Sequence, residues 1–238
     1  MTKNTVLFDL GGTLAYYYEM SEFPQRLQEC VNGVRDYLVT EGMLVVSQEE
    51  ISRKVSEEDH EEKDYRIRPL EERLFRIFEL DAASLTQELI MNMCRCFMKP
   101  IFARGYCYED TVPALSELRF KGFKIGLVSN TSWGSPAVLW REEIGRLGLC
   151  GMVDGAVFCR DVGWRKPAKQ IFEFALQKFN TSPENCVFVG DNPKWDLMGS
   201  EAVGMTAILI DRQGTVRDPT ARPIRNLHEL PGRLQPYF

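Results

Sequence analysis

Near its start the sequence reads Val6-Leu7-Phe8-Asp9-Leu10-Gly11-Gly12-Thr13-Leu14. The three apolar residues before Asp9 predict a buried strand that ends at this carboxylate. The glycines at positions 11 and 12 allow the backbone to turn sharply and to approach a ligand closely. Ligands of open α/β sheets bind at the carboxyl ends of strands, which makes Asp9 a candidate site residue. Taken alone, the stretch fits an ordinary strand end with an Asp-Gly turn equally well.

Two later apolar runs also end in polar side chains. The run 123–128 is followed by Ser129 and Asn130, and the run 186–189 leads within two residues to Asp191. The carboxyl ends of parallel strands lie at one edge of a sheet, so we expect these side chains near the first aspartate.

Helical patterns separate the strands. Apolar spacing with start and stop signals predicts helices at 110–121, 136–147, 167–179 and 194–203, and further strands at 157–158 and 205–210. Alternation of strands and helices indicates an α/β fold, with a Rossmann-like parallel sheet core that helices cover on both faces.

Only helices are predicted between the first and the second long strand. They are expected at 21–41, from 47 onward, from 69 onward and at 84–99. We therefore expect an inserted all-helical cap domain at 15–107, and an α/β catalytic core formed by 1–14 and 108–238. The joints between the two would lie near Leu14 and Tyr108.

Composition and charge limit the class of protein. The 238 residues are 44% hydrophobic and 26% charged, as in a globular protein with a real core. No apolar run approaches the roughly 20 residues that a membrane helix needs. Because a core strand is predicted within the first few residues, we expect no signal peptide. The net charge of −5 comes from residues 47–64, where eight acids face three bases. We expect no membrane partner and, because no basic stripe is present, no nucleic-acid partner.

The cysteines indicate free thiols. There are seven, scattered and without a CxxC pair, and only two histidines accompany them. This pattern argues against a zinc site and favours a reducing, cytoplasmic location.

The candidate carboxylates suit phosphoryl transfer. Asp9 can attack phosphorus and form an aspartyl phosphate, but a carboxylate that approaches a phosphate dianion is repelled. A bridging Mg²⁺ would relieve this repulsion, and Asp191 with Asp196 can hold that ion.

The other polar residues suit the phosphate itself. Ser129 and Asn130 can cradle the transferring oxygens with a hydroxyl and an amide, and the ammonium of Lys166 can neutralise charge in the transition state.

Four motifs in this order resemble those of the haloacid dehalogenase-like (HAD) hydrolases, most of which are phosphatases. They are Phe8-Asp9-Leu10-Gly11-Gly12-Thr13-Leu14, Leu127-Val128-Ser129-Asn130, Arg165-Lys166-Pro167 and Val189-Gly190-Asp191-Asn192-Pro193-Lys194-Trp195-Asp196, continued by Gly199, Ala202, Gly204 and Met205. The helical insertion lies where this family carries its cap of the first type. The resemblance implies catalytic roles for Asp9, Ser129 and Lys166, phosphate binding by Ser129, Asn130 and Lys166, and a Mg²⁺ site formed by Asp9, the backbone carbonyl of Gly11, Asp191 and Asp196.

One position departs from the family pattern. The first motif usually has a second Asp two places after the first, which serves as general acid and base, and here that place is Gly11. Glycine cannot transfer a proton, and loss of such a group typically costs about 10²- to 10⁴-fold in rate. Candidate substitutes are Tyr16, Tyr17, Tyr18, Glu19 and His60, although packing is the simpler role for the tyrosines.

Three functions follow from these residues. The first is Mg²⁺-dependent hydrolysis of a small soluble phosphomonoester, with the cap closing over the site. The second is a 2-haloacid dehalogenase, which also uses an Asp nucleophile without the second Asp but needs no metal. The third is a catalytically weakened module that binds a phosphorylated ligand, for which Gly11 is the only support.

Overall fold

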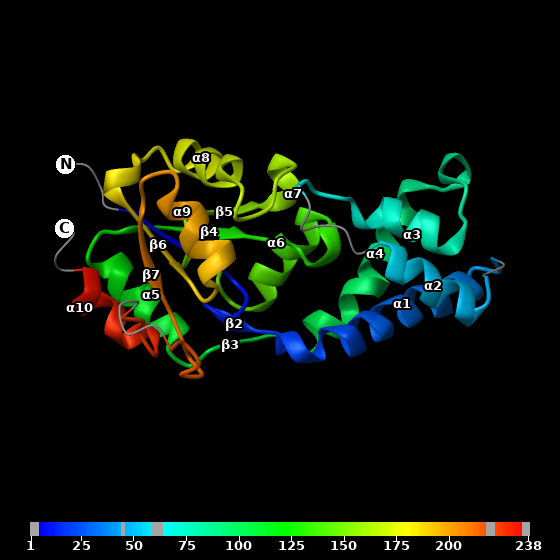
Figure 1. Cartoon of the computed structure of the whole chain (residues 1–238), viewed down its shortest axis with the longest axis horizontal. Coiled ribbons are helices and arrows are strands. Elements are labelled where there is room, and N and C mark those ends of the chain that lie inside the picture. Colours follow the sequence, from blue (N-terminus) through cyan, green and yellow to red (C-terminus); the bar gives the residue numbers. More distant parts are fainter. Residues whose placement is uncertain (1–4, 44–45, 59–63, 218–221, 235–238) are drawn as a thin grey trace.

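The computed structural model describes residues 5–43, 46–58, 64–217 and 222–234. Figure 1 shows an α/β core at one end of the molecule and a group of helices at the other. The core contains a five-stranded sheet in the order β5-β4-β1-β6-β7, and every neighbouring pair in it is parallel. Its strands are β1 (Thr5–Phe8), β4 (Lys124–Ser129), β5 (Gly155–Phe158), β6 (Cys186–Gly190) and β7 (Thr206–Leu209).

The first strand lies in the middle of this sheet. Phe8 pairs with Leu127 of β4 on one side and with Val189 of β6 on the other. The ladder continues one step further, because the amide of Asp9 donates to the carbonyl of Val189 at 2.9 Å. The carboxyl ends of β4, β1 and β6 therefore lie side by side.

Helices cover both faces of the sheet, as the alternating pattern predicts. Leu7 and Val128 face a cluster with Ile171 and Phe172 of α8, whereas the adjacent residues Val6 and Leu127 belong to the cluster that α5, α6 and α10 complete. The core helices are α5 (Thr111–Phe120), α6 (Ala137–Arg146), α7 (Cys159–Val162), α8 (Lys169–Lys178), α9 (Met198–Glu201) and α10 (Leu230–Leu234).

The insertion after the first strand is helical. It contains α1 (Phe23–Thr40), α2 (Gln48–Glu57), α3 (Leu70–Phe78) and α4 (Gln87–Phe102), and none of the sheet strands comes from it. Two short antiparallel strands, β2 (Ala15–Tyr16) and β3 (Tyr106–Cys107), join it to the core. The sequence did not predict this pair. The domain boundaries at 14/15 and 107/108 stay a prediction, which movement of the cap as one unit would test.

Several helix boundaries differ from the predicted ones. α4 begins at Gln87, directly after Thr86, whose side chain caps it, and runs through Pro100 to Phe102 instead of ending at 99. The helix expected from 167 begins two residues later, after a cis Lys166–Pro167 peptide bond. The helix expected at 194–203 is a π-helical segment (Pro193–Leu197) followed by α9.

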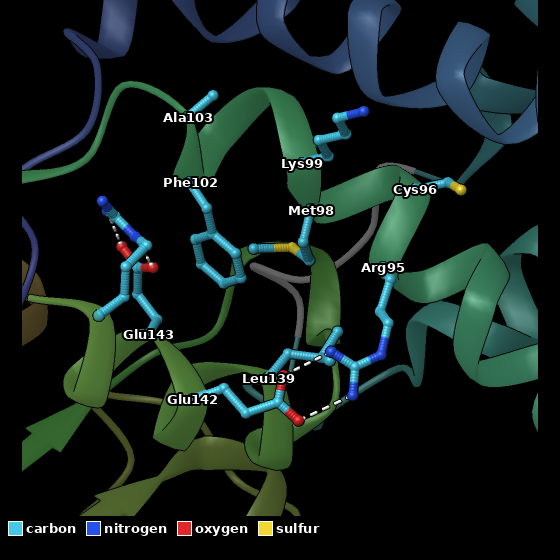
Figure 2. Close-up of a pocket in the computed structure, with 10 residues that line it drawn as sticks. Arg95, Cys96, Met98, Lys99, Phe102, Ala103, Leu139, Glu142 and Glu143 are labelled. Carbon is cyan, nitrogen blue, oxygen red and sulfur yellow. Dashed lines mark hydrogen bonds and ion pairs between the residues drawn. The ribbon is translucent and has the colours of Figure 1, made fainter.

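A groove lies between the cap and the core. Figure 2 shows its walls, which come from α4 and the residues after it on one side and from α6 on the other. Met98, Phe102 and Leu139 provide its apolar surface. Arg95 of α4 and Glu142 of α6 form a bidentate ion pair across it, with guanidinium nitrogen to carboxylate oxygen distances of 2.5 and 2.7 Å. This pair is the most direct charged link between the cap and the core in the groove.

Two further expectations concern the whole chain. The seven cysteines are all free thiols in the structure. Within the described ranges, every helix is too short or too polar to span a lipid bilayer.

Candidate active site

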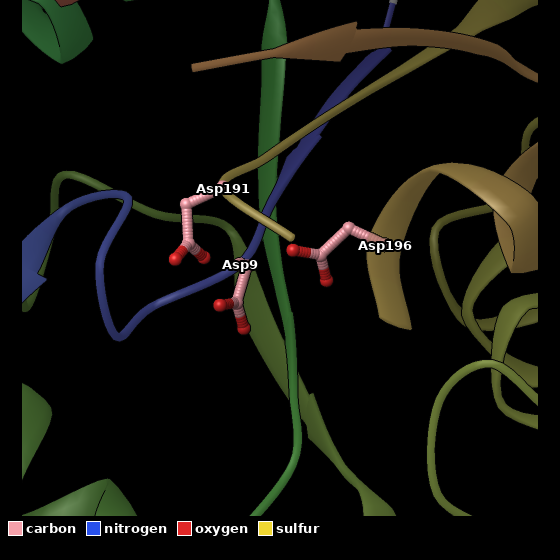
Figure 3. A group of neighbouring side chains, drawn as sticks. All are labelled: Asp9, Asp191 and Asp196. Atoms are coloured by element: carbon pink, nitrogen blue, oxygen red, sulfur yellow. The ribbon is translucent and has the colours of Figure 1, made fainter. Parts of the chain in front are cut away.

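Three carboxylates meet at the edge of the sheet where β1 and β6 end. Asp9 directly follows β1, Asp191 directly follows β6, and Asp196 lies five residues further in the π-helical segment. Figure 3 shows the three side chains pointing toward one another, and one oxygen of each lies within 4.8 Å of the others. The sequence predicted this meeting point from the strand ends.

Lys166 enters the same place from the loop before α8. Its Nζ lies 2.6 Å from Asp9 Oδ1 and 2.6 Å from Asp196 Oδ1, and the lysine is only 2% exposed. Asn130 holds the backbone of this lysine on both sides, because its Oδ1 accepts from the Lys166 amide at 2.8 Å and its Nδ2 donates to the Lys166 carbonyl at 3.3 Å. Asn130 therefore positions the ammonium in addition to any contact that it makes with phosphate.

Two glycines make room for the carboxylates. Gly12 has a φ of +78°, and a Cβ there would lie 2.3 Å from Asp191 Oδ2. A Cβ on Gly190 would lie 2.4 Å from Asp196 Oδ2 and from its Cγ. Neither position can carry a larger side chain without moving a site carboxylate, since real Cβ atoms do not approach so closely.

Asn192 orients Asp196. Its backbone amide donates to Asp196 Oδ2 at 2.9 Å, and its side-chain Oδ1 accepts from the amides of Lys194 and Trp195 at 3.0 Å each. Lys166 donates to Oδ1 of Asp196 and the Asn192 amide donates to Oδ2, so a hydrogen bond holds each carboxylate oxygen in place.

The electrostatics show a surplus of negative charge. Burial, reinforced by Asp9 and only partly offset by Lys166, raises the pKa of Asp196 to about 6. Loss of solvent, followed by the charges of Asp9 and Asp196, raises the pKa of Asp191 well above its usual value. Burial disfavours the ammonium of Lys166, but the two carboxylates that it contacts outweigh this and raise its pKa. One ammonium does not compensate three converging carboxylates.

These residues fit a divalent cation. Hard cations such as Mg²⁺ take carboxylate and carbonyl oxygens, and usually only one or two carboxylates accompany substrate phosphate and water. The converging oxygens of Asp9, Asp191 and Asp196 are of this kind, and the raised pKa values of Asp191 and Asp196 reflect a charge that a cation would relieve. The predicted ligand Gly11 lies in the same cleft lining.

The remaining predicted phosphate-binding residue, Ser129, is the last residue of β4 and is 4% exposed. It lines the same cleft as Asn130, Lys166 and the three aspartates. The structure thus brings all of the predicted site residues into one cleft of about 460 Å³, and their individual roles stay predictions.

Two of the candidate substitutes for the missing acid lie away from the cleft, and a third is buried. Tyr16 and Glu19 are not part of the cleft lining, and His60 lies outside the described residues. Tyr17 lines the cleft with its ring, but its hydroxyl is buried, and burial next to Glu143 raises its pKa.

Tyr18 is the remaining candidate, and its hydroxyl lies 3.5 Å from Ser132 Oγ. Burial raises its pKa as well. Among the described residues that line the cleft, the carboxylates are those of Asp9, Asp191 and Asp196. No fourth carboxylate of this described lining stands in for the family's acid.

The cleft lining also contains several aromatic residues, which the sequence did not predict. Its aromatic lining residues are Tyr17, Tyr18, Phe23, Trp133, Trp140 and Trp195. Trp133 and Trp195 follow β4 and β6 within five residues, so their place just after strand ends was an available signal. Phe23 begins α1, and no local pattern could have connected it with this site.

Comparison with known proteins agrees with the motifs. A curated relative, glyceraldehyde 3-phosphate phosphatase from Methanopyrus kandleri, is 29% identical over 217 residues, which covers 91% of this chain and 87% of that protein. A crystal structure of a HAD phosphatase from Thermococcus onnurineus matches with a TM-score of 0.68 at 28% identity, covering 97% of both chains. A 2-haloacid dehalogenase from Pseudomonas syringae pv. tomato DC3000 matches in fold, with a TM-score of 0.73 at 24% identity over the whole of both chains. The model of the haloacid dehalogenase-like hydrolase family matches residues 3–204, and this chain therefore belongs to the haloacid dehalogenase-like hydrolases.

Proposed function

We propose that this protein is a Mg²⁺-dependent phosphatase that hydrolyses a small phosphomonoester through an aspartyl phosphate on Asp9. The observation that carries the proposal is the contact of the Lys166 ammonium with Asp9 and Asp196, within a group of three carboxylates. A single buried ammonium beside a carboxylate nucleophile provides both the attacking group and a positive charge for a phosphate. The similarity to the glyceraldehyde 3-phosphate phosphatase from Methanopyrus kandleri supports a small phosphate ester as substrate.

Asp9, Asp191, Asp196 and the backbone carbonyl of Gly11 are the residues that would hold Mg²⁺. When bound, the ion would lower the repulsion between the carboxylates and the phosphate and would polarise the phosphoryl oxygens. The same aspartates would lose most of their mutual repulsion, because the cation adds the positive charge that Lys166 alone does not supply.

The chain's own residues suggest the order of events. Asp9 Oδ1 is engaged by Lys166, which leaves Oδ2 to attack phosphorus. The new Oδ2–P bond forms while the bond from phosphorus to the leaving oxygen breaks with its electron pair. Ser129 and Lys166 would hold the phosphoryl oxygens during this transfer.

The second half of the reaction releases the phosphate. A water attacks phosphorus, the Oδ2–P bond breaks, and Asp9 regains its carboxylate as inorganic phosphate departs. No carboxylate at position 11 is present to protonate the leaving oxygen or to activate this water, so we infer that solvent supplies the proton for the leaving oxygen and accepts the proton that the attacking water loses. The reaction should be slow for leaving groups that need a proton.

A weakened phosphate-binding module is the second candidate, and one observation favours it. The described cleft lining offers no fourth carboxylate to replace the missing acid. A 2-haloacid dehalogenase is less well supported, because displacement at carbon by one carboxylate gives no role to Asp191 and Asp196 as a charged pair.

The deciding experiment is phosphate release from a panel of phosphate esters, measured with Mg²⁺ and after chelation. We expect turnover with Mg²⁺ and none in excess chelator. Undiminished turnover in chelator would contradict the metal site, and no turnover of any ester would favour the binding module.

The seven free thiols support a reducing compartment such as the cytoplasm as the place of action.

A further inference from the structure

The cleft has an end that the proposed chemistry does not use. Beyond the aspartates and Lys166, six aromatic residues and Met20 line it, together with smaller polar residues and Arg165. A cleft of about 460 Å³ lies within the usual range for small-molecule sites and holds more than a phosphate group. The remaining space must accommodate the organic part of a substrate.

The aromatic residues of this end form a back wall and an accessible rim. Trp133, Trp140 and Tyr17 are 4–7% exposed and form the back wall. Tyr18, Phe23 and Trp195 are half-buried, so their rings still offer surface to a ligand.

The rim residues come from different segments. Tyr18 and Phe23 lie at the entry to the cap, with ring centroids 5.7 Å apart, whereas Trp195 belongs to the core segment that carries Asp196. A ligand between the cap entry and this core segment would therefore contact rings that both parts of the molecule supply.

The back wall is held in place from the cap. Trp133 has a left-handed backbone conformation with a φ of 51°, which is uncommon for a bulky residue. Phe97 stacks on its ring at 5.7 Å, and the guanidinium of Arg73 lies 4.9 Å from the ring centroid. Strained residues persist where the surroundings fix them and often lie at functional sites.

The polar groups of the lining outside the aspartates and Lys166 are hydroxyls, amides and one cation. Ser132 Oγ and the Tyr18 hydroxyl lie 3.5 Å from each other. Arg165 places its guanidinium 5.1 Å from the centroid of Trp195 and adds a cation at the rim. The carboxylates of this described lining are those of Asp9, Asp191 and Asp196, which converge on one point. An ammonium-bearing group would find no further carboxylate in the described lining to compensate its lost hydration.

We propose that the organic part of the substrate is an aromatic ring, so that the protein acts on phosphate monoesters of phenols. This inference rests on the proposed phosphatase function and adds the substrate class to it. Rings pack against aromatic walls with favourable offset or edge-to-face geometry, which aliphatic and hydroxylated groups do not provide. Phenolic leaving groups also need little protonation, which suits a site without an acid at Gly11.

The test measures binding separately from leaving-group chemistry. Benzylphosphonate and n-propylphosphonate carry the same non-hydrolysable phosphonate and differ in the ring, and calorimetry gives the Kd of each for the Mg²⁺-loaded protein. We expect the benzyl compound to bind at least tenfold more tightly. In parallel, hydrolysis of acetyl phosphate, which has a good leaving group and no ring, tests the phosphatase function alone.

Two variants assign the effect to the rim. Phe23→Leu and Trp195→Leu should each weaken benzylphosphonate binding about fivefold or more and change propylphosphonate binding less than twofold. Phe174→Leu, on α8 and outside the cleft lining, is the matched control and should change neither. Circular dichroism and Tm of each variant verify folding.

Each outcome decides a different point. Equal Kd values for the two phosphonates, tighter binding of the propyl compound, or no binding of either would overturn the aromatic substrate class. If acetyl phosphate is hydrolysed in those cases, the phosphatase function stands. If acetyl phosphate is not hydrolysed while the benzyl preference holds, the ring site stands and the protein binds its ligand without turnover.

Discussion

The two ends of the cleft are built in opposite ways. The charged end consists of Asp9, Asp191, Asp196 and Lys166, which come from two strand ends, the π-helical segment and a loop of the core. The aromatic end, in contrast, combines the entry to the cap with α6 and the core segments that follow β4 and β6. Reacting groups need fixed distances from one another, and the ends of hydrogen-bonded strands supply them. A surface of aromatic rings needs only apolar area, to which segments from several parts of the chain can contribute.

The charged end would therefore carry out the reaction, and the aromatic end would select the ligand. Changes at the charged end should act on turnover, and changes at the aromatic end should act on which ligand binds. The following predictions, in order of decreasing effect, test that separation.

The largest effect is expected for Asp9→Asn. The amide keeps the shape of the carboxylate but cannot attack phosphorus, so kcat should fall by about 10³-fold or more. Phosphate release with Mg²⁺ measures this loss, and the Kd of benzylphosphonate should stay within a few-fold of wild type. Asp36→Asn, exposed on α1, is the matched control and should have full activity. Retention of a tenth or more of the wild-type rate would refute Asp9 as the nucleophile.

Gly11→Asp introduces a carboxyl group at the position where the family usually has its general acid. The Gly11 φ lies outside the left-handed region, and a Cβ there would meet only the Tyr17 ring, at 3.6 Å, so the loop has room for a side chain. The new carboxyl should raise kcat/KM for alkyl phosphates by about 10- to 100-fold and for aryl phosphates much less.

The measurement for this variant is a leaving-group series for both proteins. The slope of log kcat/KM against leaving-group pKa should be shallower for Gly11→Asp. Equal slopes, with the variant folded and responsive to Mg²⁺, would show that another group already protonates the leaving oxygen.

The charged end should also show competition between protons and Mg²⁺. Because the pKa of Asp196 is raised to about 6 from a usual value near 3.8, the metal-free folded state takes up a proton as the pH falls through 6. This uptake stabilises the metal-free protein at pH 5 relative to pH 7.5 and opposes Mg²⁺ binding there. The increase in Tm on adding Mg²⁺ should therefore be larger at pH 7.5, by about 3–5 °C for a tenfold difference in affinity.

Asp196→Asn is the control for this competition, because an amide does not titrate. The variant should show a smaller Mg²⁺ effect with a weaker dependence on pH, since only the raised pKa of Asp191 then contributes. The same increase in Tm at both pH values in the wild-type protein would contradict a metal site that includes Asp196.

The smallest effect is expected at the groove between the cap and the core. Arg95→Gln removes the ion pair with Glu142 that joins α4 to α6, and exposed pairs contribute only about 0–1 kcal/mol. Because the aromatic end depends on the cap, benzylphosphonate binding should weaken by about two- to fourfold while acetyl phosphate turnover stays unchanged. Arg141→Gln, which breaks an ion pair with Asp161 inside the core, is the control. Equal effects of both variants would argue against this role of the groove.

Much of the charged end could be predicted from the sequence, because it depends on local features. A buried strand ends where its apolar run stops, and parallel strands bring their carboxyl ends to one edge. These two facts placed Asp9, Ser129 and Asp191 together, and the motif order supplied Lys166 and Asp196. The same local signals placed most helices to within a few residues. They failed at Pro100, where α4 continues to Phe102 because packing of the cap outweighs the tendency of proline to end a helix.

What the sequence by itself determined was the set of reacting groups, the parallel sheet and the helical insertion, since each follows from short-range pattern. The tertiary structure alone decided that Asn130 grips the backbone of Lys166, that the hydroxyl of Tyr17 is buried, and that Phe23 and Trp195 line the same cleft. The physical reason is that these relations join residues far apart in the chain. Their distances depend on how distant segments of the core, and the cap and the core, pack together, which no local spacing encodes.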